Sequence, residues 1–138
     1  ICLAFPELKI VAYHFGWPEH EVLNSLAWKH RNLYISMSGM LGPLYYAPIR
    51  LAHMVGLVMN ILGGSEKIIF GTDWPAAPAD LSVKAVLNLQ IPKELQEGWG
   101  YPPITDQDRA NMFGLNLAKL LNVEVPKKYR RGFKTSGQ

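Results

Sequence analysis

The chain has 138 residues, which is enough for one small domain or for part of a larger one. Hydrophobic residues make up 49% of it and charged residues 18%, which excludes a disordered chain and a collagen-like repeat. The single cysteine, Cys2, excludes a disulfide scaffold and a CxxC motif, and it favours a reducing, cytoplasmic location.

The net charge of +3 is unevenly distributed along the chain. Residues 127–138 contribute +5 of it, which leaves −2 for residues 1–126. A basic tail can contact nucleic acid or an anionic membrane, but no nucleic-acid module precedes it. We therefore predict a solvated basic tail at residues 126–138 after a domain of residues 1–125, with neither nucleic acid nor membrane as a partner.

The chain begins with an apolar run, residues 1–5, and without an initiator methionine. No charged region precedes a long apolar stretch, so a signal peptide is not predicted. The run is typical of the end of a helix that begins elsewhere. We expect a truncated or cleaved chain, or one half of a split protein.

Three short apolar segments predict buried strands, and a helical pattern follows each of them. The predicted strands are residues 9–13, 33–36 and 67–70. Predicted helices cover residues 18–30, 48–62, 80–89 and 105–121, with Asp80 as the N-cap of the third and a near capping box at Thr105. Residues 38–43 and 91–103 are predicted loops.

The predicted helix at residues 48–62 is apolar almost all round. A membrane span needs about 20 apolar residues, whereas this run is shorter and carries Arg50 and His53. A buried or interface helix is therefore predicted. Arg50 would pair with an acidic neighbour or with a substrate carboxylate.

Alternation of strands and helices predicts an α/β fold with a parallel sheet. Three strands do not close a barrel, and a complete (β/α)8 TIM barrel needs about 250 residues. The chain fits the C-terminal part of such a barrel, about strands 6–8 with their helices.

Two polar residues follow directly on predicted strands, and both lie close to glycine. His14 follows the first strand and Asp73 the third. In barrels of this kind catalytic residues gather at the C-terminal ends of the strands, where imidazole and carboxylate groups bind metals or transfer protons. The alternatives are a hydrogen-bonded core histidine and a turn-forming aspartate.

Four segments in order resemble the amidohydrolase-related metal-dependent hydrolases of the amidohydrolase 2 type. Residues 5–14, FPELKIVAYH, are similar to that family's FPxLKIVxxH segment, and residues 26–36, LAWKHRNLYIS, to its next strand. Residues 67–75, KIIFGTDWP, resemble its GTDYP signature, and residues 113–121, FGLNLAKLL, its closing GxNAxxLL helix. The family includes hydrolases and decarboxylases of the aminocarboxymuconate-semialdehyde and resorcylate types.

The resemblance implies a TIM barrel with a divalent metal ion, commonly zinc or manganese. Asp73 would be the aspartate ligand after strand eight, and His14 the histidine after strand six that activates water or contacts substrate. Asn116 would support the last strand.

Two tryptophans, Trp17 and Trp74, flank His14 and Asp73 in the sequence. They are predicted to line the substrate pocket or, alternatively, to pack at the mouth of the barrel. Trp28 is predicted to lie in the core.

The chain departs from the family pattern at several positions. Ser36 stands where aspartate is frequent, and the loop after His14 is more aromatic than the usual HxGG. The HxH of the family's first strand and the histidine after its fifth are not in this chain. The remaining histidines are not expected to replace them, because they lie on or at the ends of predicted helices: His20, His30 and His53.

These residues predict a metal-dependent hydrolase of a small carbonyl or carboxylate substrate. Its activity would require the N-terminal half of the barrel, from the same parent or from a separate chain, because a catalytic metal usually takes three or more protein ligands. An oligomer is expected. The alternatives are a nonoxidative decarboxylase of the same family and a non-catalytic fragment that completes a barrel.

Overall fold

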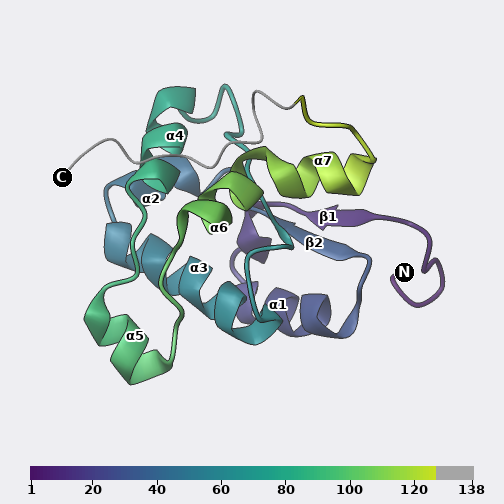
Figure 1. The fold of residues 1–138 in the computed structure, drawn as a ribbon, viewed down its shortest axis with the longest axis horizontal. Coiled ribbons are helices and arrows are strands. Elements are labelled where there is room, and N and C mark those ends of the chain that lie inside the picture. The colour runs from purple at the N-terminus through teal and green to yellow at the C-terminus, as the bar shows by residue number, and fades with distance from the viewer. Residues whose placement is uncertain (127–138) are drawn as a thin grey trace.

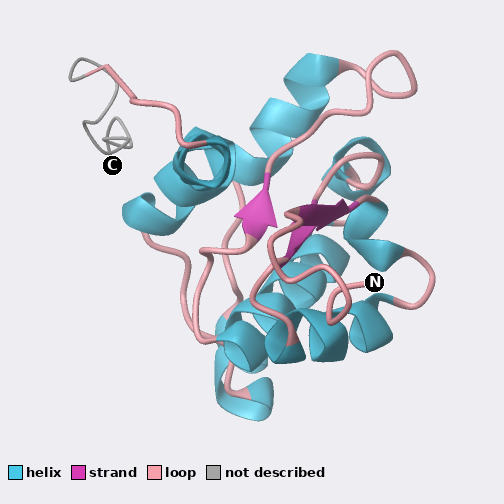
Figure 2. Ribbon diagram, turned by 90° about the vertical axis from the view of Figure 1, so that its right-hand side faces the viewer, coloured by secondary structure: helices cyan, strands magenta, loops and turns pink. Residues whose placement is uncertain are grey.

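The computed structural model describes residues 1–126, so the predicted basic tail lies almost entirely outside the described residues. Three strands, β1 (Ile10–Ala12), β2 (Leu33–Ser36) and β3 (Ile68–Ile69), form one sheet in that order (Figures 1 and 2). Both strand pairs are parallel. The prediction of an α/β fold with a parallel sheet is confirmed.

Seven α-helices lie between and after the strands within the described part of the chain. In chain order they are α1 (His20–Lys29), α2 (Leu41–Tyr45), α3 (Pro48–Leu62), α4 (Ala79–Leu87), α5 (Lys93–Trp99), α6 (Asp106–Ala110) and α7 (Asn116–Leu121). A 3-10 turn, η1 (His14–Gly16), follows β1, and a π-helical turn, η2 (Asn111–Leu115), joins α6 to α7. None of these helices is long and apolar enough to cross a membrane.

Four expectations about local structure were wrong. α2 begins within the predicted loop at residues 38–43, and the predicted loop at residues 91–103 contains α5. Asp80 does not cap α4, which begins after Pro78; the Asp80 carboxylate instead binds Lys84 one turn later, at 3.0 Å. Trp28 is 66% exposed, because it lies on the face of α1 that points away from the described core.

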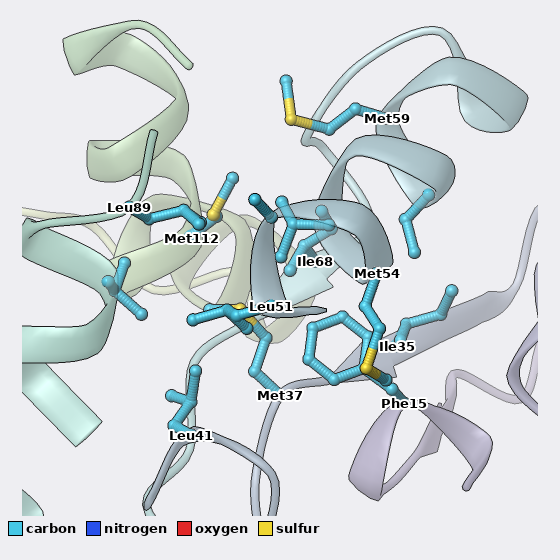
Figure 3. Packing of buried hydrophobic residues seen from close by; sticks show 14 of the residues in the cluster. Phe15, Ile35, Met37, Leu41, Leu51, Met54, Met59, Ile68, Leu89 and Met112 are labelled. Carbon is cyan, nitrogen blue, oxygen red and sulfur yellow. The ribbon is translucent and has the colours of Figure 1, made fainter. Parts of the chain in front are cut away.

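The core lies on one face of the sheet. Leu33, Ile35 and Ile68 are almost completely buried there and pack with α1 and α3, which lie below β1 and β2 in Figure 1. Figure 3 shows Phe15, from the turn after β1, within the same cluster. The apolar helix predicted at residues 48–62 is confirmed as α3, with its inner face buried against this cluster.

The C-terminal helical segment is attached to β3 by polar contacts. The Asn116 side-chain amide donates to the carbonyl oxygens of Ser65 and Ile68, at 2.7 and 2.8 Å, so its predicted supporting role is confirmed.

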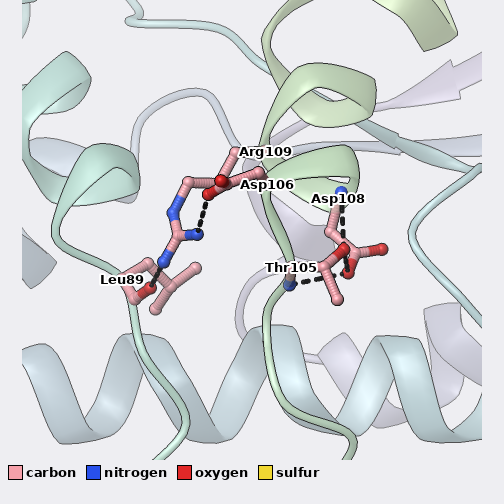
Figure 4. Close-up of polar contacts among 5 residues, drawn as sticks. All are labelled: Leu89, Thr105, Asp106, Asp108 and Arg109. Atoms are coloured by element: carbon pink, nitrogen blue, oxygen red, sulfur yellow. Dashed lines mark hydrogen bonds and ion pairs between the residues drawn. The ribbon is translucent and has the colours of Figure 1, made fainter. Parts of the chain in front are cut away.

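Polar contacts also hold α6. Thr105 and Asp108 form the capping box of α6 (Figure 4). Arg109, which is buried, donates to Asp106 and to the carbonyl of Leu89.

Candidate active site at the carboxyl ends of the strands

The structure brings His14 and Asp73 together. His14 opens the turn η1 two residues after β1, and Asp73 lies four residues after β3. The His14 Nε2 and Asp73 Oδ1 atoms are 3.5 Å apart, and the two side chains are 48% and 38% exposed. Both therefore face solvent at the same end of the sheet while touching one another, which is an arrangement that a ligand or ion can reach.

Both residues are held in an uncommon backbone conformation. His14 has φ of 59° and Asp73 has φ of 63°, in the left-handed region that costs a non-glycine residue on the order of 1 kcal/mol or more. Phe15, the next residue after His14, is 1% exposed and anchors the turn in the core. The buried Phe15 thus explains how His14 can stay in this conformation and remain directed out of the core.

The turn that follows β2 lies directly against His14. Gly39 has φ of 71°, and a β-carbon built on it would lie 2.7 Å from His14 Cδ2 and 2.9 Å from Nε2. Only a residue without a side chain permits this contact. No sequence pattern indicates this role, because Gly39 lies in a segment that is predicted only as a loop.

Ser36 at the end of β2 and Ser38 two residues beyond it lie close to the backbone that leads to Asp73. A β-carbon on Gly71 would lie 3.0 Å from the β-carbon of Ser38 and 3.2 Å from Ser36 Oγ. Ser36 Oγ also accepts the backbone N–H of Ser38, at 3.2 Å. Ser36, at the position where aspartate is frequent, is therefore hydrogen-bonded within the strand end.

The two tryptophans flank the site but differ in their surroundings. Trp17 is 49% exposed, and the Arg50 guanidinium carbon lies 4.7 Å from the centroid of its ring. Arg50 therefore makes a cation–π contact, and no ion pair with an acidic neighbour is seen among residues 1–126. Its pairing with a substrate carboxylate stays a prediction. Trp74 is 71% exposed, and its backbone N–H donates to Thr72 Oγ1 at 3.2 Å. Their predicted role as pocket walls stays a prediction.

His14 and Asp73 do not make a complete metal site by themselves. Among residues 1–126, no group of three or more His, Cys, Asp or Glu side chains is placed to hold a metal ion. Two of the three other histidines have side-chain contacts elsewhere: His20 Nδ1 lies 3.3 Å from the carbonyl oxygen of Pro18, and His53 Nδ1 lies 3.2 Å from the Tyr101 hydroxyl.

The sequence model of the amidohydrolase family matches residues 1–123, which is most of the chain. The chain belongs to the amidohydrolase family. No match is found among curated proteins.

Solved structures with the same fold include enzymes that contain metals. A dihydroxybenzoic acid decarboxylase from Polaromonas sp. JS666, with bound manganese and 2-nitroresorcinol, matches with a TM-score of 0.58 at 18% identity, over 87% of this chain and 35% of that one. An amidohydrolase from Burkholderia multivorans with bound zinc gives 0.60 at 14% identity, over 89% and 47%. A TIM-barrel protein from Bordetella bronchiseptica gives 0.53 at 24% identity, over 86% and 36%.

These likenesses establish the fold of this amidohydrolase-family chain as part of a TIM barrel. The chain spans between 35% and 47% of the length of those three proteins. Its three parallel strands account for only part of the eight that a barrel requires. The predicted fold, the C-terminal part of a TIM barrel, agrees with the partial parallel sheet and with these partial matches.

Proposed function

We propose that this chain supplies part of the active site of a metal-dependent hydrolase that acts on a small carbonyl or carboxylate substrate. The observation that carries the proposal is the 3.5 Å approach of His14 Nε2 and Asp73 Oδ1 at the carboxyl ends of the first and last strands. Catalytic residues of TIM barrels lie at this face. Membership of the amidohydrolase family supports the same assignment.

A divalent cation fits the donor atoms that the chain provides. The Asp73 carboxylate is 38% exposed, so a cation can reach it, and the His14 imidazole lies 3.5 Å away, where it can contact a water molecule or substrate atom beside that cation. Carboxylate oxygen and imidazole nitrogen suit zinc, and carboxylate also suits manganese. Zinc and manganese occur in the matching structures described above.

Asp73 would hold the cation through its carboxylate, and His14 would act beside it. When bound, a divalent cation polarises a carbonyl oxygen and lowers the pKa of water, which is the chemistry that hydrolysis near neutral pH needs. Asp73 can accept the proton that is released. His14 can orient the attacking water or donate a hydrogen bond to the oxyanion that develops on the substrate. Trp17 and Trp74 would line the substrate pocket.

The remaining ligands and strands would come from the N-terminal half of the barrel, as part of the same parent or as a separate chain. β1 and β3 are the two edge strands of the described sheet, and each pairs only with β2. An exposed strand edge is a template for further pairing. We propose the cytoplasm as the compartment, since Cys2 is the single cysteine and no disulfide is needed.

Replacement of Asp73 by Asn tests the proposal in the assembly that completes the barrel. We expect loss of turnover with assembly retained, measured on p-nitrophenyl acetate as an ester and on 2,6-dihydroxybenzoate as an aromatic acid. Asp80→Asn is the matched control, because Asp80 pairs with Lys84 on exposed α4. Unchanged turnover in Asp73→Asn would remove the enzymatic role of this half and favour a non-catalytic, barrel-completing fragment.

Nonoxidative decarboxylation is the second candidate, because a matching structure is a dihydroxybenzoic acid decarboxylase with bound manganese. The two reactions differ in their products. Release of carbon dioxide from 2,6-dihydroxybenzoate, with no hydrolysis of the ester, would assign decarboxylation. Hydrolysis without carbon dioxide would assign the reaction proposed here.

A further inference from the structure

Ser38 carries a buried hydroxyl group that has no hydrogen-bond partner in the described part of the chain. Its side chain is 3% exposed. The large majority of buried polar side-chain atoms in proteins have a partner, and leaving one unpaired costs on the order of 1–3 kcal/mol. The unpaired hydroxyl therefore needs an explanation that packing alone does not give.

The position of Ser38 connects it to both site residues. Ser36 is paired with Ile69, so continuing the same parallel register by two residues places Ser38 opposite Gly71, two residues before Asp73. The close approach of Ser38 to Gly71 supports this register. On its other side, Ser38 is followed by Gly39, whose backbone touches the His14 ring. Ser38 thus lies two residues beyond the middle strand, β2, between the segments that carry His14 and Asp73.

The contacts of Gly71 place the Ser38 side chain away from the helical core. Ser36 follows the core residue Ile35 in β2 and so projects from the opposite face of the sheet. A β-carbon built on Gly71 would meet both the Ser38 β-carbon and Ser36 Oγ, so the two serines lie on the same side. In a closed barrel that face is the interior. Ser36 accepts the backbone N–H of Ser38, which fixes the backbone and leaves the Ser38 hydroxyl free to bind another group.

We infer that Ser38 is a substrate-binding residue, whose hydroxyl donates a hydrogen bond to an oxygen atom of a carbonyl or carboxylate substrate held beside His14 and Asp73. This inference rests on the proposed function of the site. Ionised Asp73 can only accept hydrogen bonds, so a neutral hydroxyl donor complements it opposite a substrate oxygen. A preorganised donor in a buried position needs no reorganisation when the substrate binds.

Replacement of Ser38 by Ala tests the inference by two independent measurements. In the assembly that completes the barrel, Ser38→Ala is expected to raise KM about tenfold with kcat nearly unchanged, since one hydrogen bond to the substrate is lost. In thermal unfolding of the 138-residue chain, its melting temperature is expected to be no lower than that of the wild type, because no hydrogen bond within the chain is removed.

Ser82 provides a matched control on α4. It is also fully buried, and its Oγ atom also has no partner in the described residues, but it does not lie at a strand end. Ser82→Ala is expected to match Ser38→Ala in thermal unfolding and to leave KM at the wild-type value.

The outcomes separate this inference from the proposed function. If the wild-type assembly turns over neither p-nitrophenyl acetate nor 2,6-dihydroxybenzoate, the proposed function fails and the role of Ser38 fails with it. If Asp73→Asn abolishes turnover while Ser38→Ala keeps the wild-type KM, only the role of Ser38 is overturned. A clear drop in melting temperature for Ser38→Ala alone would also overturn it, because the hydroxyl would then be structural.

Discussion

The contact between Gly39 and His14 makes Gly39 decisive for the geometry of the site. Gly39→Ala would introduce a methyl group 2.7 Å from His14 Cδ2 in addition to straining a left-handed backbone. The backbone effect alone is about 1 kcal/mol, and the overlap adds to it on the order of 1–3 kcal/mol. We expect the variant to lose this stability in urea unfolding and, in the completed barrel, to lose turnover because the imidazole is displaced.

Gly63→Ala is the control that separates these two effects. Gly63 has φ of 77°, close to that of Gly39, but a β-carbon built on it meets nothing within 4 Å. It should therefore show the backbone cost alone. Equal destabilisation of the two variants would mean that the His14 ring can move away freely, and that Gly39 does not position it.

At the scale of single residues, the sequence predicts only part of the site. His14 and Asp73 are predictable because each lies shortly after a predicted apolar strand, and the structure places them in contact. Gly39 and Ser38 are not predictable, because the role of Gly39 depends on the His14 side chain, 25 residues away, and that of Ser38 on the register between neighbouring strands. Single-residue patterns do not contain that information.

At the level of secondary-structure elements, the clearest stabilising contacts are the polar ones at the start of α6. Asp108 accepts the backbone N–H of Thr105 at 2.9 Å and the Ser65 hydroxyl at 2.7 Å. Burial raises the pKa of the Asp108 carboxyl, but hydrogen bonds from Thr105 and Ser65 outweigh it, so the pKa lies below its ordinary value. The ionised form is therefore favoured by folding.

Asp108→Asn is expected to lower the free energy of unfolding at pH 7 by about 1–2 kcal/mol, because an acceptor of the capping box is lost. The folded-state pKa is depressed, so the contribution of Asp108 is present above its unfolded value of about 3.9 and lost as pH falls through the folded value. Urea unfolding from pH 7 to pH 2 should show the difference between wild type and variant shrinking below about pH 4.

Asp80→Asn is the control for the pH series. Asp80 binds Lys84 on an exposed helix face, and such pairs contribute little to stability. A loss for Asp108→Asn that is no greater than the loss for Asp80→Asn, or one that is constant down to pH 2, would contradict the assignment of Asp108 as an ionised cap.

The elements show where local patterns suffice. α3 begins and ends where its apolar pattern predicts, and the Thr105 cap is confirmed. α2 was missed because Gly42 and Pro43 are poor helix formers, yet α2 packs on the segment before α4 so closely that a β-carbon on Gly42 would lie 2.5 Å from that of Ala77. Packing of that kind overrides helix propensity and cannot be derived from the local sequence.

Across the whole molecule, the donor set limits what the chain can do alone. One imidazole and one carboxylate are fewer than the three or more protein ligands of ordinary catalytic zinc sites. We expect the isolated 138-residue chain to retain no stoichiometric zinc or manganese after gel filtration, measured by elemental analysis, and to be inactive. A tight, stoichiometric ion in the chain by itself would contradict this expectation and the need for an N-terminal half.

The two sheet edges predict that the chain associates. β1 and β3 each offer one unpaired edge within the described sheet, and large apolar side chains next to β1 are exposed, among them Leu8 and Tyr13. Native mass spectrometry of the purified material should therefore give a mass above the 15.5 kDa of the single chain. Denaturing mass spectrometry of every polypeptide present would show what covers these edges.

The composition of that assembly decides between the two roles proposed for this chain. A second polypeptide carrying an HxH at a predicted strand end would supply the missing ligands, so that His14 and Asp73 complete a shared metal site. Assemblies of the 138-residue chain alone would leave each copy with its imidazole and carboxylate but without an HxH. Because one histidine and one aspartate do not hold a catalytic metal, that result would favour a non-catalytic fragment over an enzyme.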